Sequence, residues 1–299
     1  MSISADGKTL AAVQRRISPS VFITPVSGSP ATRTDVGPIK NAYAMSWTTS
    51  GDLLVIDNDG VSKISADGIN RTKLINAPHS TILTVSSCPD GRFVLAWQDH
   101  ERRGTNVWRL DADGSNEKRL TEGTRDVDPE CSSDGRWIYF VDAEHSKIKR
   151  VSIDGGESTI VPGSETPYIS IGAPALSPDG RHLAFLAAVV GSPLEKKLML
   201  LTLSDDTNPI TRILTPDPRI AGKLQFTRDG LALAYAIREN YAENLWVQPL
   251  KQDPGRQITQ FDSDSIDELH FSPDGKKVAI VRTHADSDVV LLRDSSTAH

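Results

Sequence analysis

The chain has 299 residues, of which 24% are charged and 38% hydrophobic, and its formal net charge is −6. A negatively charged chain offers nothing to the phosphates of nucleic acids, and no apolar stretch approaches the roughly 20 residues that cross a membrane. We therefore expect no nucleic-acid partner and no membrane span, and the N-terminal MSISADGKTL does not have the pattern of a signal peptide.

One four-residue motif recurs from the first residues to the last. Its glycine returns in steps of 44, 40, 44, 45, 50 and 45 residues. The seven copies are SADG at 4–7, TTSG at 48–51, CPDG at 88–91, SSDG at 132–135, SPDG at 177–180, TRDG at 227–230 and SPDG at 272–275. A nearly constant period of this size indicates a repeat architecture.

Each copy has the residues of a tight turn, which we call the corner. Proline presets φ, aspartate bonds to nearby backbone, and glycine accepts positive φ without steric cost. Three places after the glycine an apolar run begins in every copy, as in Leu183–Leu186. An unbroken apolar run predicts a strand that is buried on both faces.

A second turn follows in most repeats, for example between the predicted strands Asn106–Leu110 and Lys118–Glu122. Each repeat thus holds four short strands, A to D, and no helical pattern. Such a unit, with both faces covered, is typical of a propeller blade. We predict an all-β single domain spanning 1–299, a seven-bladed β-propeller of four-stranded antiparallel blades, with six blades as the alternative.

The outer D strand can be identified in six places only. They are Thr32–Val36, Arg71–Asn76, Glu117–Glu122, Ser158–Pro162, Ile210–Leu214 and Arg256–Phe261. The last blade has strand A at Ile266–Phe271, B at Lys276–Thr283 and C at Asp288–Arg293, and then six residues remain. Propellers commonly complete the final blade with a strand from the other end of the chain. We therefore expect the closing strand before Met1, and an incomplete last blade whose open edge can pair with another molecule.

The repeat resembles the TolB-type propeller repeat, which has an N-x-W strand and a D-G turn before an x-x-L-T strand. Asn106–Thr121 and Asn244–Thr259 carry this pattern best. Relatives include periplasmic TolB, the propeller of prolyl-oligopeptidase-like peptidases, and bacterial serine/threonine kinases with a C-terminal propeller. The ending SDVVLLRDSS at Ser287–Ser296 looks most like those kinases. The resemblance implies the sensor or interaction propeller of a larger kinase.

Catalytic motifs are absent from the sequence. It has no glycine-rich kinase loop, HRD, DFG or G-x-S-x-G elbow. It has no P-loop, H-E-x-x-H or zinc spacing either. We therefore predict a non-catalytic binding module with no cofactor and no metal. Two alternatives stay open, namely a stand-alone periplasmic propeller that works like TolB, and a propeller-type lyase or hydrolase with a site built from distant loops.

The two cysteines, Cys88 and Cys131, fall near the corners of neighbouring blades. A disulfide requires Cβ atoms within about 4 Å, and adjacent inner strands of propellers are usually farther apart, so we expect buried thiols. Two cysteines are too few for a disulfide framework. This favours a reducing, cytoplasmic compartment, and leaves a periplasmic location open if a membrane segment lies upstream.

The B–C loops and the connections between repeats vary in length and composition, and they share the face opposite the corners. Propellers carry function on such loops, and mixed charges with tyrosines suit a peptide or protein partner. We expect a protein, peptide or small ligand at this loop face or at the channel mouth. The candidate binding residues are Asp99, His100, Arg102, Arg103, Arg125, Asp126, Asp142, His145, Tyr168, Arg219, Arg238, Tyr241 and His284.

Overall fold

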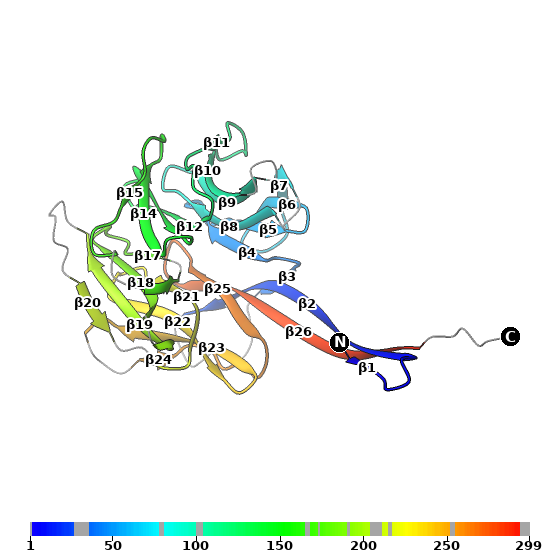
Figure 1. Cartoon of the computed structure of the whole chain (residues 1–299). Coiled ribbons are helices and arrows are strands. Elements are labelled where there is room, and N and C mark those ends of the chain that lie inside the picture. The colour runs from blue at the N-terminus through cyan, green and yellow to red at the C-terminus, as the bar shows by residue number, and fades with distance from the viewer. Residues whose placement is uncertain are drawn as a thin grey trace.

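The computed structural model describes residues 2–26, 36–77, 81–99, 104–164, 168–172, 174–189, 192–203, 211–214, 217–251 and 255–293. Within these residues the regular elements are all β-strands. The described residues contain no helix that is long and apolar enough to cross a membrane. The strands form six sheets of antiparallel neighbours (Figure 1). The predicted all-β propeller fold is confirmed, with six sheets in the described part of the chain.

Five sheets are each formed by consecutive strands, and we number them 1 to 5. Sheet 1 holds β4 (Ala44–Trp47), β5 (Leu53–Asp57), β6 (Gly60–Ile64) and β7 (Arg71–Asn76). Sheet 2 holds β8 (Ile82–Ser87), β9 (Phe93–Asp99), β10 (Gly104–Leu110) and β11 (Lys118–Arg119). Sheet 3 holds β12 (Asp126–Cys131), β13 (Trp137–Asp142), β14 (Lys147–Ser152) and β15 (Thr159–Ile160). Sheet 4 holds β16 (Tyr168–Ile171), β17 (Ala175–Leu176), β18 (His182–Val189), β19 (Ser192–Thr202) and β20 (Thr211–Leu214). Sheet 5 holds β21 (Ile220–Phe226), β22 (Ala232–Glu239), β23 (Ala242–Pro249) and β24 (Arg256–Gln257).

The corner motif closes its hairpins in the predicted way. In the last copy, the Gly275 N–H donates to the Ser272 carbonyl at 2.8 Å. Asp274 Oδ1 accepts from the Ser272 hydroxyl at 2.6 Å and from the Lys276 N–H at 3.1 Å. Gly275 has φ near 70°, in the left-handed region that favours glycine. The same glycine-to-carbonyl bond forms at the other six corners, so the repeated motif is a repeated turn.

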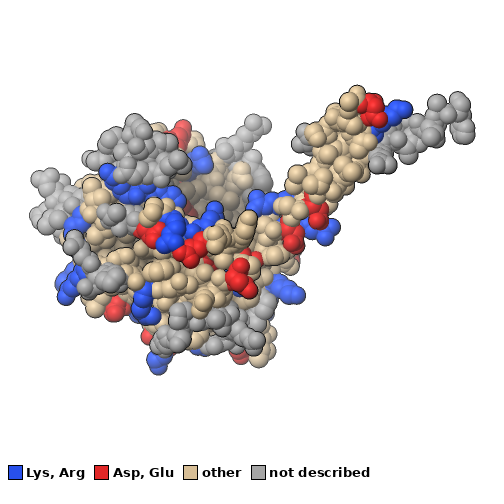
Figure 2. Space-filling model, turned by 90° about the horizontal axis from the view of Figure 1, so that it is seen from below, with Lys and Arg blue, Asp and Glu red and all other residues tan. Residues whose placement is uncertain are grey.

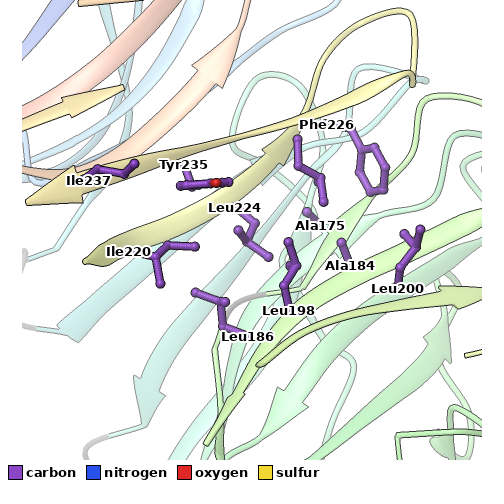
Figure 3. Packing of buried hydrophobic residues seen from close by; sticks show 11 residues of the cluster. Ala175, Ala184, Leu186, Leu198, Leu200, Ile220, Leu224, Phe226, Tyr235 and Ile237 are labelled. Atoms are coloured by element: carbon purple, nitrogen blue, oxygen red, sulfur yellow. The ribbon is translucent and has the colours of Figure 1, made fainter. Parts of the chain in front are cut away.

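Neighbouring sheets pack face to face through apolar side chains. Figure 3 shows Leu186 and Leu198 of sheet 4 facing Ile220 and Leu224 of sheet 5. Five further clusters join the other neighbours in the same way, and one of them packs Val281 and other residues of the last sheet against sheet 1. The sheets therefore form a closed ring.

The last sheet, which we call the closing sheet, combines both ends of the chain. It holds β25 (Ser265–Phe271), β26 (Lys277–Arg293), β2 (Thr9–Pro25) and β3 (Val36–Lys40). The prediction of an incomplete last blade that needs a strand from before Met1 is wrong, because β2 pairs with β26 along all of its length. The expected turn near 284–287 contains no glycine or proline, so nothing breaks the strand there, and B and C form one continuous β26.

The outer halves of β2 and β26, together with β1 (Ser2–Ile3), project from the ring (Figure 1). We call this feature, residues 2–17 and 285–293, the arm. It carries the first corner, so the first repeat extends the closing sheet and forms no seventh sheet. Figure 2 shows charged side chains near the base and the tip of the arm and other side chains between them. Six of the eleven exposed large hydrophobic side chains of the described chain belong to it: Ile3, Val13, Ile17, Val289, Leu291 and Leu292.

Cys88 and Cys131 form a disulfide bond, with their Cα atoms 5.2 Å apart. The prediction of buried thiols is therefore wrong in its chemistry, although both residues are buried. Cys88 directly follows β8 and Cys131 ends β12. These inner strands converge on the centre of the ring, which brings the two residues closer than the general spacing of blades suggested. The bond links sheets 2 and 3.

Because the arm is exposed, the same substitution should lower the free energy of unfolding less in the arm than at the equivalent repeat position in the ring. Leu10 and Leu183 both lie three places after a corner glycine, but Leu183 is fully buried and Leu10 is partly exposed. We expect Leu183→Ala to lower the free energy of unfolding by about 2–5 kcal/mol and Leu10→Ala by less than about 1 kcal/mol. Urea unfolding measures both. Equal losses would show that the arm is buried in solution.

Reduction of the disulfide should destabilise the ring. The bond closes a loop between residues 43 positions apart, and bonds of this kind contribute about 2–4 kcal/mol. We expect dithiothreitol to lower the midpoint of thermal unfolding of the native chain. The double variant Cys88→Ala/Cys131→Ala should start at the lower midpoint and should not respond to the reductant. A native chain that is equally stable with and without dithiothreitol would contradict this role.

Candidate functional site

A cavity of about 280 Å³ lies where the inner strands of all six sheets end. One set of lining residues precedes each corner glycine by four places: Trp47, Ser87, Cys131, Leu176, Phe226 and Phe271. A second set, nearer the turns, precedes it by two places: Thr49, Pro89, Ser133, Pro178, Arg228 and Pro273. Because one repeat position supplies a wall residue from every sheet, the cavity is the corner end of the central channel.

A smaller cavity of about 40 Å³ lies farther from the corners, lined by residues of sheets 2 to 5 and of the closing sheet. Glu130 of β12 and Gln225 of β21 line both cavities. The two cavities are therefore consecutive parts of one channel, and Glu130 stands at the boundary between them.

A partly buried ion cluster crosses this inner part of the channel. Lys223 Nζ lies 2.5 Å from Glu268 Oε1 and 3.2 Å from Asp128 Oδ1. Glu268 Oε2 accepts the N–H of Met45 at 3.0 Å. Burial opposes the charged form of Lys223, but its two carboxylate partners outweigh burial and raise its pKa above the ordinary value. The cluster connects β4, β12, β21 and β25, and it satisfies charges that would be costly to bury alone.

Glu130 differs from Asp128 and Glu268 because its one described hydrogen-bond partner is an uncharged backbone group. Its Oε2 accepts the N–H of Leu176 at 3.1 Å. Burial raises the pKa of Glu130 to about 8, although that hydrogen bond and the charge of Lys223 favour the ionised form. At neutral pH the Glu130 carboxyl group is therefore mostly protonated.

His270 lines the inner cavity and stays neutral. Burial, with a smaller contribution from Lys223, lowers the pKa of its imidazole to about 3. Its backbone carbonyl accepts the indole N–H of Trp47 at 2.9 Å, which joins the closing sheet to sheet 1 beside the larger cavity.

The sequence prediction missed these channel residues, although a signal for them was present. Glu130 and His270 both precede their corner glycine by five places, and Asp128, Lys223 and Glu268 precede theirs by seven. The strands β12, β21 and β25 each have a register shift near these positions, so simple alternation does not assign their faces. The signal is the recurrence of ionisable residues at these two offsets from the corner.

Three of the predicted binding residues lie together at one end of sheet 3. Asp126 and Asp142 are cross-strand partners, and His145 Nδ1 is 2.9 Å from Asp142 Oδ2. Lys149 Nζ is 2.7 Å from the same oxygen. Burial opposes ionisation of Asp142, but Lys149 and His145 hold its pKa below the ordinary value, whereas burial raises the pKa of Asp126. Both carboxyl groups are buried, so their contacts stabilise the sheet end.

The other described candidates are exposed side chains: Arg125, Arg219, Arg238, Tyr241 and His284. Arg219 pairs with Asp217 at 2.7 Å and His284 with Asp264 at 2.7 Å. Arg125 lies at the same end of sheet 3 as the group above, where its carbonyl accepts the Ala143 N–H at 2.9 Å. His100, Arg102, Arg103 and the side chains of Asp99 and Tyr168 lie outside the described residues. Ligand binding by the loop face stays a prediction. The described residues contain no group of three or more His, Cys, Asp or Glu that could hold a metal ion.

The raised pKa of Glu130 predicts a pH-dependent stability difference. The folded chain binds this proton more tightly than the unfolded chain, so the contribution of Glu130 is fully present below about pH 4 and is lost as pH rises towards 8. Glutamine keeps an oxygen for the Leu176 N–H and cannot ionise. We expect Glu130→Gln to match the native chain near pH 4 and to be more stable by about 2–4 kcal/mol near pH 9.

Urea unfolding at the two pH values measures this difference. Glu157→Gln, which replaces an exposed glutamate, serves as the control and should leave the pH dependence unchanged. A stability difference between Glu130→Gln and the native chain that does not vary with pH would contradict the assignment.

Comparison with known proteins supports the fold. No family model matches the sequence. A putative TolB from Agrobacterium tumefaciens superposes with a TM-score of 0.67 at 16% identity, over 90% of this chain and 99% of that chain. TolB from Acinetobacter baumannii gives a TM-score of 0.59 at 15% identity, over 89% of this chain and 63% of that chain.

Two curated relatives are much longer than this chain. The uncharacterized peptidase YuxL of Bacillus subtilis is 26% identical over 241 residues, which are 76% of this chain and 33% of YuxL. A Tricorn protease homolog of Saccharolobus solfataricus is 30% identical over 156 residues, which are 50% of this chain and 14% of that protein. The chain thus spans a third or less of these relatives, and its fold is that of the TolB-type β-propellers.

Proposed function

We propose that the chain is a non-catalytic binding propeller that takes a segment of a peptide or protein partner at the corner end of its channel. One observation carries the proposal: the cavity there has wall residues from every sheet of the ring. A site built on six rigid strands is pre-organised, and this lowers the entropic cost of binding.

The dimensions and the lining favour a piece of a larger partner. A volume of about 280 Å³ lies just below the range of about 300–1,000 Å³ for small-molecule pockets, and it suits one side chain or one chain end. Nearer the turns, Thr49, Ser133 and Arg228 can bond to the rest of the segment. An apolar centre with a polar rim is the usual composition of a protein interface.

The chain would serve as one part of a longer polypeptide, since it spans a third or less of the length of its curated relatives. The ending Ser287–Ser296 supports a kinase parent, for which the propeller would be the sensor or interaction module. A second candidate is a periplasmic binding propeller that works like TolB. The disulfide Cys88–Cys131 favours this candidate, because such bonds persist in oxidising compartments.

Two matched substitutions test where the partner binds. Thr49 lines the corner cavity and Thr124 precedes β12 at the opposite end, and both are exposed. Peptides are first selected from a display library on the native chain, and their dissociation constants are then measured by fluorescence polarisation. We expect Thr49→Trp to obstruct the cavity and weaken binding at least tenfold, and Thr124→Trp to change it less than about twofold.

The reverse pattern would place the site on the loop face and contradict the channel. Mass spectrometry of the bound peptides checks the remaining alternative, because cleaved peptides would indicate a lyase or hydrolase. Thermal unfolding of both variants confirms that an altered affinity does not reflect loss of the fold.

A further inference from the structure

The wall of the corner cavity differs from one side to the other. Trp47, Phe226 and Phe271 come from sheet 1, sheet 5 and the closing sheet, which are consecutive in the ring. The opposite wall has Ser87, the disulfide of Cys88 and Cys131, and Leu176, from sheets 2, 3 and 4. Aromatic side chains attract cations through the negative faces of their rings. One half of the wall is therefore aromatic, and a ring whose face is turned to the cavity would attract a positively charged group.

Glu130 stands at the inner end of this cavity, and it is the one carboxylate among the described lining residues. Its Oε2 accepts the Leu176 N–H, and its Oε1 makes no hydrogen bond to any described residue. A carboxylate oxygen can accept two hydrogen bonds. Glu130 can therefore accept a donor that enters from the cavity.

The described ionisable groups around Glu130 include no cation that pairs with its ionised form directly. Asp128 on its own strand and Glu268 on β25 share one cation, Lys223 of β21. His270 on β25 stays neutral because burial lowers its pKa. When Glu130 is ionised, this neighbourhood has three carboxylates and one ammonium group, so a cation beside Glu130 would reduce the excess of negative charge.

We propose that the cavity binds the positively charged group of a peptide, either an N-terminal ammonium or a lysine side chain, against the Glu130 carboxylate and the aromatic half of the wall. The inference rests on the proposed function, since it names the ligand of the same site. Arg228 is the one cation among the described lining residues. It precedes its corner glycine by two places and so lies nearer the turns, whereas Glu130 precedes its own by five and lies farther inside. The bound cation thus lies deeper in the channel than Arg228. The Arg228 guanidinium can then donate to backbone carbonyl groups in the part of the peptide nearer the corner turns.

Binding of a cation has a thermodynamic signature at this site. Glu130 is mostly protonated near pH 7, because burial raises its pKa to about 8. An ammonium group at hydrogen-bond distance favours the carboxylate and lowers that pKa. Binding at pH 7 should therefore release a proton, and affinity should increase from pH 6 to pH 8.

Three peptides of equal length separate charge from shape and distinguish the two sources of the cation. Ac-Gly-Lys-Gly-NH₂ carries a side-chain ammonium, Gly-Gly-Gly-NH₂ a terminal ammonium, and Ac-Gly-norleucine-Gly-NH₂ no charge. Isothermal titration calorimetry at pH 7, in phosphate and in Tris, gives the affinity and the number of protons released. We expect at least one charged peptide to bind tenfold more tightly than the neutral one, with proton release.

Glu130→Gln should abolish the tenfold preference and the proton release, and Glu157→Gln, on the outer surface, should retain both. Circular dichroism at pH 6 shows whether the variants are folded. Equal affinity for charged and neutral peptides would overturn the cation site and leave the binding propeller intact. No binding of any of the three peptides would also overturn the cation site, and the library peptides of the Thr49→Trp test then decide separately whether the channel binds at all.

Discussion

Every sheet of this molecule is apolar on both faces, and the structure depends on covering both. Val94 and Leu95 are adjacent in β9 and fully buried, yet Val94 packs towards sheet 3 and Leu95 towards sheet 1. No stack with two ends can satisfy such sheets, because each terminal sheet would expose one apolar face. A closed ring satisfies all of them. The pairing of β2 with β26 is therefore essential, since it completes the sheet that contacts both sheet 5 and sheet 1.

Closure also explains the chemistry of the channel. Inner strands of six sheets must converge, and residues at one repeat position then meet across the centre. Ionisable residues on those strands become neighbours at low solvent exposure, where each unpaired charge is expensive. Lys223 is accordingly shared between Asp128 and Glu268, and Glu130, which has no cation of its own, holds a proton instead. The same convergence brings Cys88 and Cys131 within bonding distance.

Local features could be predicted from the sequence because local residues cause them. The corner turns follow from the bonds that Ser, Asp and Gly make within six residues, and outer strands such as β7 and β20 lie where turn residues bound a short run. The closing pair could not be predicted, since it joins residues 9–25 to residues 277–293 and has no turn signal between them. The channel site was missed for a related reason. Its residues are distant in the sequence, and only their common offset from the corner connects them.

The arm shows where local and global requirements separate. Its corner makes the same hydrogen bonds as those of the ring, for instance from the Gly7 N–H to the Ser4 carbonyl at 2.9 Å. Beyond this turn, however, Val13 is 67% exposed, whereas Leu183 at the start of β18's apolar run is fully buried. Repeats of this type cannot bury their apolar faces alone. The turn therefore specifies only a hairpin. A hairpin becomes part of a blade when a neighbouring sheet covers each of its apolar faces. The first hairpin lacks these neighbours, so seven corners produce six sheets.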